Sequence, residues 1–187
     1  MEEPVLKPAR ADFAIRAALP ADVRELLRLF RELAVYEKLE HMAAGTEPML
    51  HEALFGARPA AEAMVAERGG RAVGFALYFT TFSTFLCKPG LYLEDLFVEP
   101  AHRGLGIGKA LLRELAALAA RRGCGRLEWR VLDWNEPSIR FYESLGASLL
   151  KEWILVRMTR DELEALAKSK MGSKMGSDYF LAGPSKK

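Results

Sequence analysis

The stretch "HRGLGIGKALLREL" (residues 102–115) places three glycines at every second position, directly before a helix-forming segment. Glycine is a poor helix former, but at a helix start it lets backbone N–H groups come close to an anion. Leu111, Leu115 and Leu118 then recur on one stripe, which predicts an amphipathic helix. The sequence therefore predicts an anion-binding loop, or alternatively a turn that only packs closely against the preceding strand.

Two common phosphate-binding motifs do not match this loop. A P-loop needs a glycine five residues before the Gly-Lys pair, where Arg103 stands, and a Ser or Thr where Ala110 stands. A dinucleotide fingerprint needs a third glycine where Lys109 or Leu111 is found. What remains is an Arg-Gly-x-Gly-x-Gly segment between a strand and a helix.

The rest of the chain alternates between strand-like and helix-like patterns, which predicts an α/β fold with a mixed sheet. The predicted strands cover residues 13–19, 61–68, 72–82, 91–98, 126–132 and 149–158. The predicted helices open at 20–22, span 47–55, follow the glycine loop, and span 136–146 and 159–167.

Charge is unevenly distributed along the 187 residues. The net charge is +2, but residues 168–187 hold five lysines and one aspartate, which leaves 22 basic and 24 acidic residues elsewhere. A nucleic-acid-binding body would carry a basic surface, so no nucleic-acid partner is expected. We expect one domain over residues 1–167 and a basic, low-complexity tail over 168–187. Its composition predicts disorder, whether it is a natural tail, a frameshifted end or an added segment.

Composition excludes several other classes of protein. The two cysteines and three histidines have no disulfide or metal-binding spacing, so no metal is expected. No apolar stretch reaches membrane-spanning length, and the first residues lack a signal-peptide core. A cytoplasmic protein without a membrane partner is the resulting expectation.

A second motif follows the glycine loop along the chain. Residues 134–147 read "WNEPSIRFYESLGA", and about 30 residues earlier Arg103, Gly106 and Gly108 form the pattern [Q/R]-x-x-G-x-[G/A]. These two motifs, in this order, resemble the GCN5-related N-acetyltransferase (GNAT) superfamily. Together with "ELAVYEKLE" and "LYLEDLFV", they resemble its diamine branch, which includes spermidine/spermine and thialysine acetyltransferases. The resemblance implies a mostly antiparallel, twisted sheet with a splayed strand pair, flanked by helices.

The resemblance also implies that acetyl-CoA is the co-substrate. Its pyrophosphate would meet backbone N–H donors at a positive helix end, and its pantetheine arm would pair with the end of the preceding strand. Asn135 would hydrogen-bond the arm, serve as a helix N-cap, or both. The implied cofactor-binding residues are Leu96, Phe97, Val98, Arg103, Gly104, Leu105, Gly106, Ile107, Gly108, Lys109, Asn135, Ser138 and Tyr142.

Acetyl transfer needs a proton acceptor for the amine and a proton donor for the leaving thiolate. The resemblance implies that Tyr142 is the donor, although a tyrosine on such a helix is otherwise often a core residue. Alternation places Glu94 and Asp95 on opposite faces, and the resemblance implies that Glu94 faces the substrate and accepts its proton through water. Asp95, Tyr36 and Glu37 complete the expected substrate site, and a structural role for Asp95 remains open.

The expected acceptor is the primary amine of a small molecule: a diamine, a polyamine or a lysine-like amino acid. The loop "TFSTFLCKPG" (81–90) contains no carboxylate that would grip a long polycation, which favours a short acceptor. By resemblance the protein is a homodimer. Two alternatives remain open: acetylation of protein lysines or N-termini, and a non-catalytic acetyl-CoA-binding module.

Overall fold

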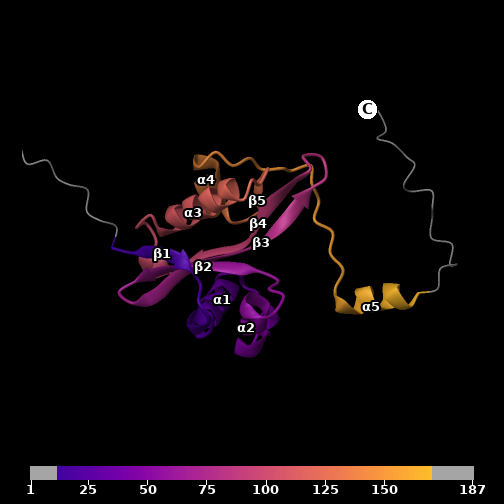
Figure 1. Ribbon diagram of the computed structural model, residues 1–187, viewed down its shortest axis with the longest axis horizontal. Coiled ribbons are helices and arrows are strands. Elements are labelled where there is room, and N and C mark those ends of the chain that lie inside the picture. Colours follow the sequence, from indigo (N-terminus) through magenta and orange to yellow (C-terminus); the bar gives the residue numbers. More distant parts are fainter. Residues whose placement is uncertain (1–11, 170–187) are drawn as a thin grey trace, which may run out of the picture. The chain divides into compact units, whose positions relative to one another are not determined.

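The computed structural model describes residues 12–169 of the chain (Figure 1). The strands are β1 (Ala14–Ala17), β2 (Glu62–Arg68), β3 (Arg71–Ser83), β4 (Lys88–Val98) and β5 (Leu127–Trp129). The α-helices are α1 (Val23–Glu37), α2 (Glu47–Phe55), α3 (Ile107–Arg121), α4 (Glu136–Ser144) and α5 (Arg160–Lys168). Short 3-10 helices cover Pro20–Asp22, Glu40–Met42 and Pro100–His102.

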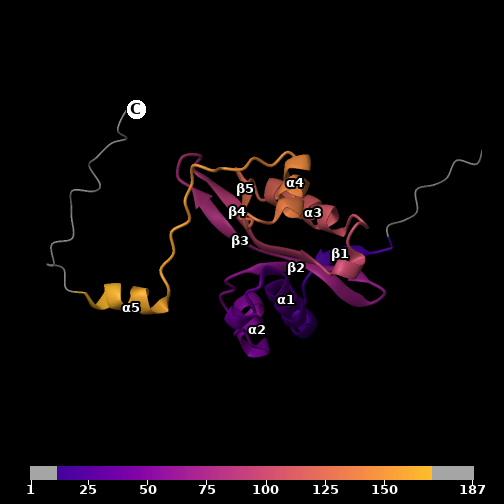
Figure 2. The same cartoon turned by 180° about the vertical axis from the view of Figure 1, so that it is seen from behind.

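The strands form one sheet in the order β1-β2-β3-β4-β5. The first four strands are antiparallel to their neighbours, and β5 runs parallel to β4. Two layers of helix cover this sheet: α1 and α2 lie on one face and α3 lies on the other, as the views from both sides show (Figures 1 and 2). The predicted mixed sheet, mostly antiparallel and flanked by helices, is confirmed.

Both helix layers bury the apolar stripes that the sequence predicted. On the α1 side, Leu26 and Leu29 pack with Phe75 of β3 in one fully buried cluster. On the other side, Leu111 and Leu115 of α3 are completely buried. Each such side chain contributes about 1.5–3 kcal/mol through burial, so the sheet and its helices hold the strand ends rigidly.

The strand β4 separates from β5 halfway along its length. Only residues 91–93 of β4 pair with β5, whereas the pairing with β3 continues to Val98. Within residues 12–169, residues 94–98 therefore have a sheet neighbour on one side only. This is the splayed pair that the sequence resemblance implied, and it leaves backbone groups of the β4 end available to another partner.

The β3–β4 pairing contains a β-bulge next to this divergence. Leu77 lies opposite Asp95 and Tyr78 lies opposite Leu93, so Glu94 has no opposing residue on β3. A bulge of this kind bends the strand and re-aims the side chains around it. It fixes which acidic side chain of the Glu94-Asp95 pair points into the α1 side of the molecule.

The described contacts divide the chain into two compact units, with the boundary between Asn135 and Glu136. The second unit contains α4 and α5, and α5 begins with a capping box between Thr159 and Glu162. The extent of the predicted domain, residues 1–167, remains a prediction. The predicted tail falls almost entirely on residues 170–187, outside the described residues.

The predicted strand over 149–158 is wrong for this structure. The segment has no regular secondary structure, and Trp153, Ile154 and Val156 are 72%, 86% and 84% exposed. A strand needs a neighbour for its backbone N–H and C=O groups, and within residues 12–169 this segment has no strand partner. The apolar and β-branched side chains that led to the prediction therefore remain exposed.

Candidate functional site

The glycine loop owes its shape to two positive φ angles. Gly104 has φ +78° and Gly106 has φ +82°, a region that side-chain-bearing residues rarely adopt. Apart from each glycine and its two chain neighbours, no atom of the described residues would lie within 4 Å of a Cβ at either position, so the space above the loop is open there. Gly106 is the N-cap of α3, and Gly108 lies in its first turn, which contains no acidic residue. The free N–H groups of this helix start can therefore bind an anion.

Glu99 anchors the start of this loop from inside the molecule. Its side chain is almost completely buried, and its Oε1 accepts hydrogen bonds from Arg28 Nη1 at 2.6 Å and Arg71 Nη2 at 2.7 Å. Oε2 lies 3.4 Å from Nε2 of His102 in the loop itself. Glu99 thus ties the loop to α1 and β3. The sequence analysis missed this residue, because a lone glutamate before a proline carries no pattern that distinguishes it.

Five residues of the predicted site meet at the end of β4. The Arg103 guanidinium lies over the ring of Tyr36, 4.8 Å from its centroid, and 5.7 Å from that of Phe97. Arg103 Nε also donates to the carbonyl of Val98 at 3.0 Å. The Tyr36 hydroxyl in turn donates to Oδ1 of Asn135 at 3.2 Å. The structure therefore brings together predicted residues from α1, from β4, from the loop and from the segment before α4.

A pocket of about 270 Å³ opens between α1 and the segment that follows it, with the β4 end as one wall. Its apolar lining includes Leu27, Phe30, Leu33, Leu39 and Met42. Its polar lining consists of Glu37 and Asp95, the two carboxylates, and Arg31. Apolar walls with few polar groups are typical of small-molecule sites.

The two carboxylates of the pocket are both shifted toward the protonated form. Burial, together with the negative charges of Glu94 and Glu37, raises the pKa of Asp95 to about 6. Burial also raises the pKa of Glu37. A carboxyl group whose pKa lies near neutrality can take up and release a proton under working conditions, which is what a general base needs.

The two acidic residues of β4 have different environments, as alternation predicted. Asp95 is half-buried and lines the pocket, whereas Glu94 is exposed and does not line it. Glu94 is nevertheless close enough for its charge to raise the pKa of Asp95. The role of Glu94 as the proton acceptor remains a prediction, and Asp95 enters the site as a second candidate.

The remaining predicted cofactor-binding residues differ in exposure. Leu105 is exposed at the loop surface, and Leu96 is half-buried on β4. Ile107 is buried in the core, so only its backbone is available to a ligand. Ser138 and Tyr142 lie on α4 in the second unit, where Tyr142 is buried.

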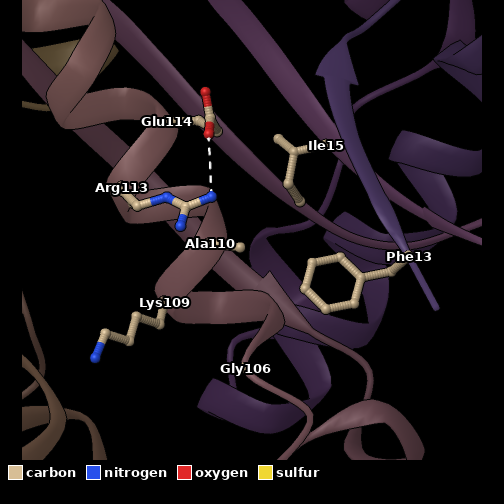
Figure 3. A pocket seen from close by; sticks show the side chains of 7 residues that line it. All are labelled: Phe13, Ile15, Gly106, Lys109, Ala110, Arg113 and Glu114. Carbon is tan, nitrogen blue, oxygen red and sulfur yellow. Dashed lines mark ion pairs between the residues drawn. The ribbon is translucent and has the colours of Figure 1, made fainter. Parts of the chain in front are cut away.

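A second hollow, of about 480 Å³, borders the start of α3 (Figure 3). Phe13 and Ile15 form one side of it, and α3 contributes the charged side chains on the other. Arg113 is paired with Glu114 at 3.5 Å, while exposed Lys109 has no ion pair within residues 12–169. Lys109 therefore leaves a net positive charge beside the glycine loop.

Residues 12–169 contain neither a metal-binding cluster nor a membrane-spanning helix. No group of three or more His, Cys, Asp or Glu side chains in this part of the chain could hold a metal ion. None of the helices described there is both long enough and apolar enough to cross a membrane.

Comparisons with known proteins agree with this architecture. The model of the acetyltransferase (GNAT) family matches residues 23–147. The chain is 33% identical to an L-ornithine N5-acetyltransferase of Arabidopsis thaliana, over 82% of this chain and 87% of that protein. It is 35% identical to the thialysine N-epsilon-acetyltransferase of Mus musculus, over 84% of this chain and 98% of that protein.

A solved structure with the same fold is an integron cassette protein from the mobile metagenome of V. cholerae. It aligns with a TM-score of 0.72 and 31% identity, over 84% of this chain and 99% of that one. The splayed β4, the glycine loop and the acidic pocket thus occur in a chain that shares both sequence and fold with acetyltransferases. The protein is a member of the GNAT family of acetyltransferases.

Proposed function

We propose that this protein transfers an acetyl group from acetyl-CoA to the primary amine of a small molecule. The observation that carries the proposal is the pocket beside the β4 end, in which apolar walls surround the carboxylates of Glu37 and Asp95. Such a pocket suits a short aliphatic chain that ends in an ammonium group. Relatives that act on ornithine and thialysine, by their names, support the same acceptor class.

The glycine loop and the β4 end fit the acetyl donor. Open space above Gly104 and Gly106, the free N–H groups of the α3 start and the charge of Lys109 would hold the pyrophosphate. Val98 and its neighbours on β4 have no partner on the β5 side, so their backbone would pair with the pantetheine arm. Asn135, on the other side, would hydrogen-bond that arm.

The acceptor must lose a proton before it attacks, because an alkyl ammonium has a pKa of about 10.4. The carboxylates of the pocket would hold the cation, and Glu94 or Asp95 would take the proton, through water in the case of Glu94. The neutral amine then attacks the thioester carbonyl directly and forms a tetrahedral intermediate. Its collapse breaks the C–S bond, and Tyr142 would protonate the departing thiolate.

We further propose that the protein is a homodimer, in which a second copy covers the exposed segment 149–158. The composition of this segment is that of a strand, and its apolar side chains are exposed at Trp153, Ile154 and Val156. Pairing with a strand of a second copy would satisfy its backbone and bury these side chains. Location in the cytoplasm and the absence of nucleic-acid and membrane partners stay predictions of the sequence.

The experiment that tests the function is thiol release from acetyl-CoA in the presence of a panel of primary amines. We expect turnover with short diamines and lysine-like amino acids, and a lower kcat/KM with spermine. Glu94→Gln and Asp95→Asn should each be compared with Asp161→Asn, a surface carboxylate on α5. The variant that lacks the true base loses activity most near neutral pH and recovers it at high pH, where free amine is plentiful. Absence of amine-dependent thiol release across the panel would contradict the proposal.

A further inference from the structure

Arg31 is an unexpected cation in an otherwise acidic pocket. It lies on α1, is exposed at the pocket, and contributes to the same lining as Glu37 and Asp95. A pocket built only for a diamine or polyamine gains nothing from a guanidinium, because its positive charge repels both ends of such a molecule. The presence of Arg31 therefore calls for an acceptor that also carries a negative group.

Arg31 is not occupied by neighbouring carboxylates. Arg28, one turn earlier on α1, is paired with Glu25, Glu32 and Glu99. Arg31 makes no hydrogen bond or ion pair with any side chain in the region from 12 to 169. Its guanidinium has five N–H donors in a planar fork, and all of them remain available to a ligand.

The two kinds of charge come from different turns of α1 and from β4. Arg31 and Glu37 are six residues apart on α1, which corresponds to about 9 Å along the helix axis. Burial raises the pKa of Glu37, and burial together with the charges of Glu94 and Glu37 raises the pKa of Asp95. Arg31 forms no ion pair with either carboxylate among residues 12–169, so the lining of the pocket carries separate charges of both signs.

We propose that Arg31 binds the α-carboxylate of the acceptor, so that the enzyme selects a free diamino acid of the lysine or ornithine type. This inference rests on the function proposed above and narrows its substrate class. Guanidinium and carboxylate pair through two parallel N–H···O bonds, which fixes the orientation of the acceptor. The apolar walls would then take the methylene chain, and the carboxylates would receive the side-chain ammonium at the β4 end.

The same geometry disfavours two other acceptors. A diamine lacks the carboxylate and leaves Arg31 unpaired beside an ammonium group. A lysine within a polypeptide has its α-carboxylate converted to an amide, so it loses the charge that Arg31 recognises. The proposal therefore predicts that the enzyme distinguishes a free amino acid from a protein lysine by the α-carboxylate alone.

The test compares acceptors that differ in that group: lysine, lysinamide and cadaverine. Wild-type protein should favour lysine over lysinamide by about 10-fold in kcat/KM, since a hydrogen bond to a charged group contributes about 1.5–3 kcal/mol and Arg31 is partly solvated. Arg31→Gln should remove this preference through the KM for lysine, and leave lysinamide and cadaverine unchanged or slightly improved. Arg31→Lys should restore part of it.

Arg24→Gln is the matched control, because Arg24 is an exposed arginine on α1 that does not line the pocket. It should behave as wild type. An equal loss with lysine and lysinamide in Arg31→Gln, or no wild-type preference, would overturn the inference. Calorimetric binding of lysine and lysinamide keeps the two proposals distinguishable. Turnover with equal preference for lysine and lysinamide would contradict only the role of Arg31. Tighter binding of lysine than of lysinamide without thiol release would contradict only the catalytic proposal.

Discussion

Burial of Asp95 destabilises the folded chain at neutral pH, because its carboxylate loses water and faces Glu94 and Glu37. A residue kept in such a place is more often part of a site than of a stabilising core. The same burial, together with the charges of Glu94 and Glu37, raises the pKa of Asp95 to about 6, which brings its proton exchange into the working range. For Asp95, the burial that suits proton transfer therefore lowers the stability of the folded protein.

Asp95→Asn should therefore stabilise the protein in a pH-dependent manner. The folded pKa lies above the ordinary value of 3.8, so the folded state binds the proton more tightly than the unfolded state. Stability from this group is highest when both states are protonated, falls as the pH rises from about 4 to 6, and stays low above that range. Thermal unfolding should show a gain of about 1–3 kcal/mol near pH 8 that shrinks toward pH 4.5. A gain of equal size at both pH values would show that the charge of Asp95 is not its cause.

Tyr142 offers a sharper test of catalysis. Tyr142→Phe keeps the ring and its packing but removes the only proton that the side chain can donate. Turnover should fall by roughly 10²- to 10⁴-fold, the usual range for a positioned acid or base. Acetyl-CoA affinity and melting temperature should stay close to the wild-type values. Near-normal turnover in a folded variant would mean that Tyr142 is only a packing residue.

Among the elements, those with a strong hydrophobic period or a clear stop signal, such as Gly56 after α2, could be predicted from the sequence. Helix α2 has the predicted bounds, 47–55, and the glycine loop leads into α3 where the motif placed it. The strand over 149–158 failed, because the propensity of a segment does not supply its hydrogen-bonding partner. The bulge at Glu94 also left no trace in the sequence, since an extra residue in one strand is visible only against its neighbour.

The candidate site, too, could be predicted only in part from the sequence. Motifs predicted the residues that meet at the end of β4, among them Tyr36, Arg103 and Asn135. They did not predict Glu99, which pairs with Arg28 and Arg71 far from it in sequence, or the place of Arg31 in the lining of the pocket. Whether a lone charged residue is buried, paired or directed into a pocket depends on tertiary packing, and no local pattern encodes it.

Glu99 allows a test at the level of elements, because it joins the loop to α1 and β3. Glu99→Gln should lower the free energy of unfolding by roughly 1–3 kcal/mol, since Arg28 and Arg71 lose their shared buried partner. Glu62→Gln is the matched control: its pair with Arg122 is more exposed and should cost less than about 1 kcal/mol. Chemical denaturation measures both. Equal losses in the free energy of unfolding would show that burial does not strengthen the pairs of Glu99 with Arg28 and Arg71.

For the whole molecule, the exposed segment 149–158 is the feature that a monomer does not explain. If a second copy covers it, Ile154→Asp combined with Val156→Asp should convert a dimer into a monomer in light scattering. Val35→Asp replaces an exposed apolar residue on α1 and should leave the dimer intact. A wild-type protein that is monomeric at micromolar concentration would contradict the dimer and would indicate that the segment is covered within its own chain.

If the acceptor binds against Asp95 as proposed, the raised pKa of this residue makes acceptor binding a proton-release reaction. An ammonium group placed against the carboxylate lowers its pKa, so the complex carries fewer protons than the free protein and the free amine together. Below about pH 6 each binding event expels up to one proton into the buffer, and affinity rises with pH by up to about tenfold per unit until Asp95 is ionised. The measured heat of binding then depends on which buffer receives that proton. The proposed pocket would thus couple capture of an amine to the acidity of the surrounding solution, before any acetyl group has moved.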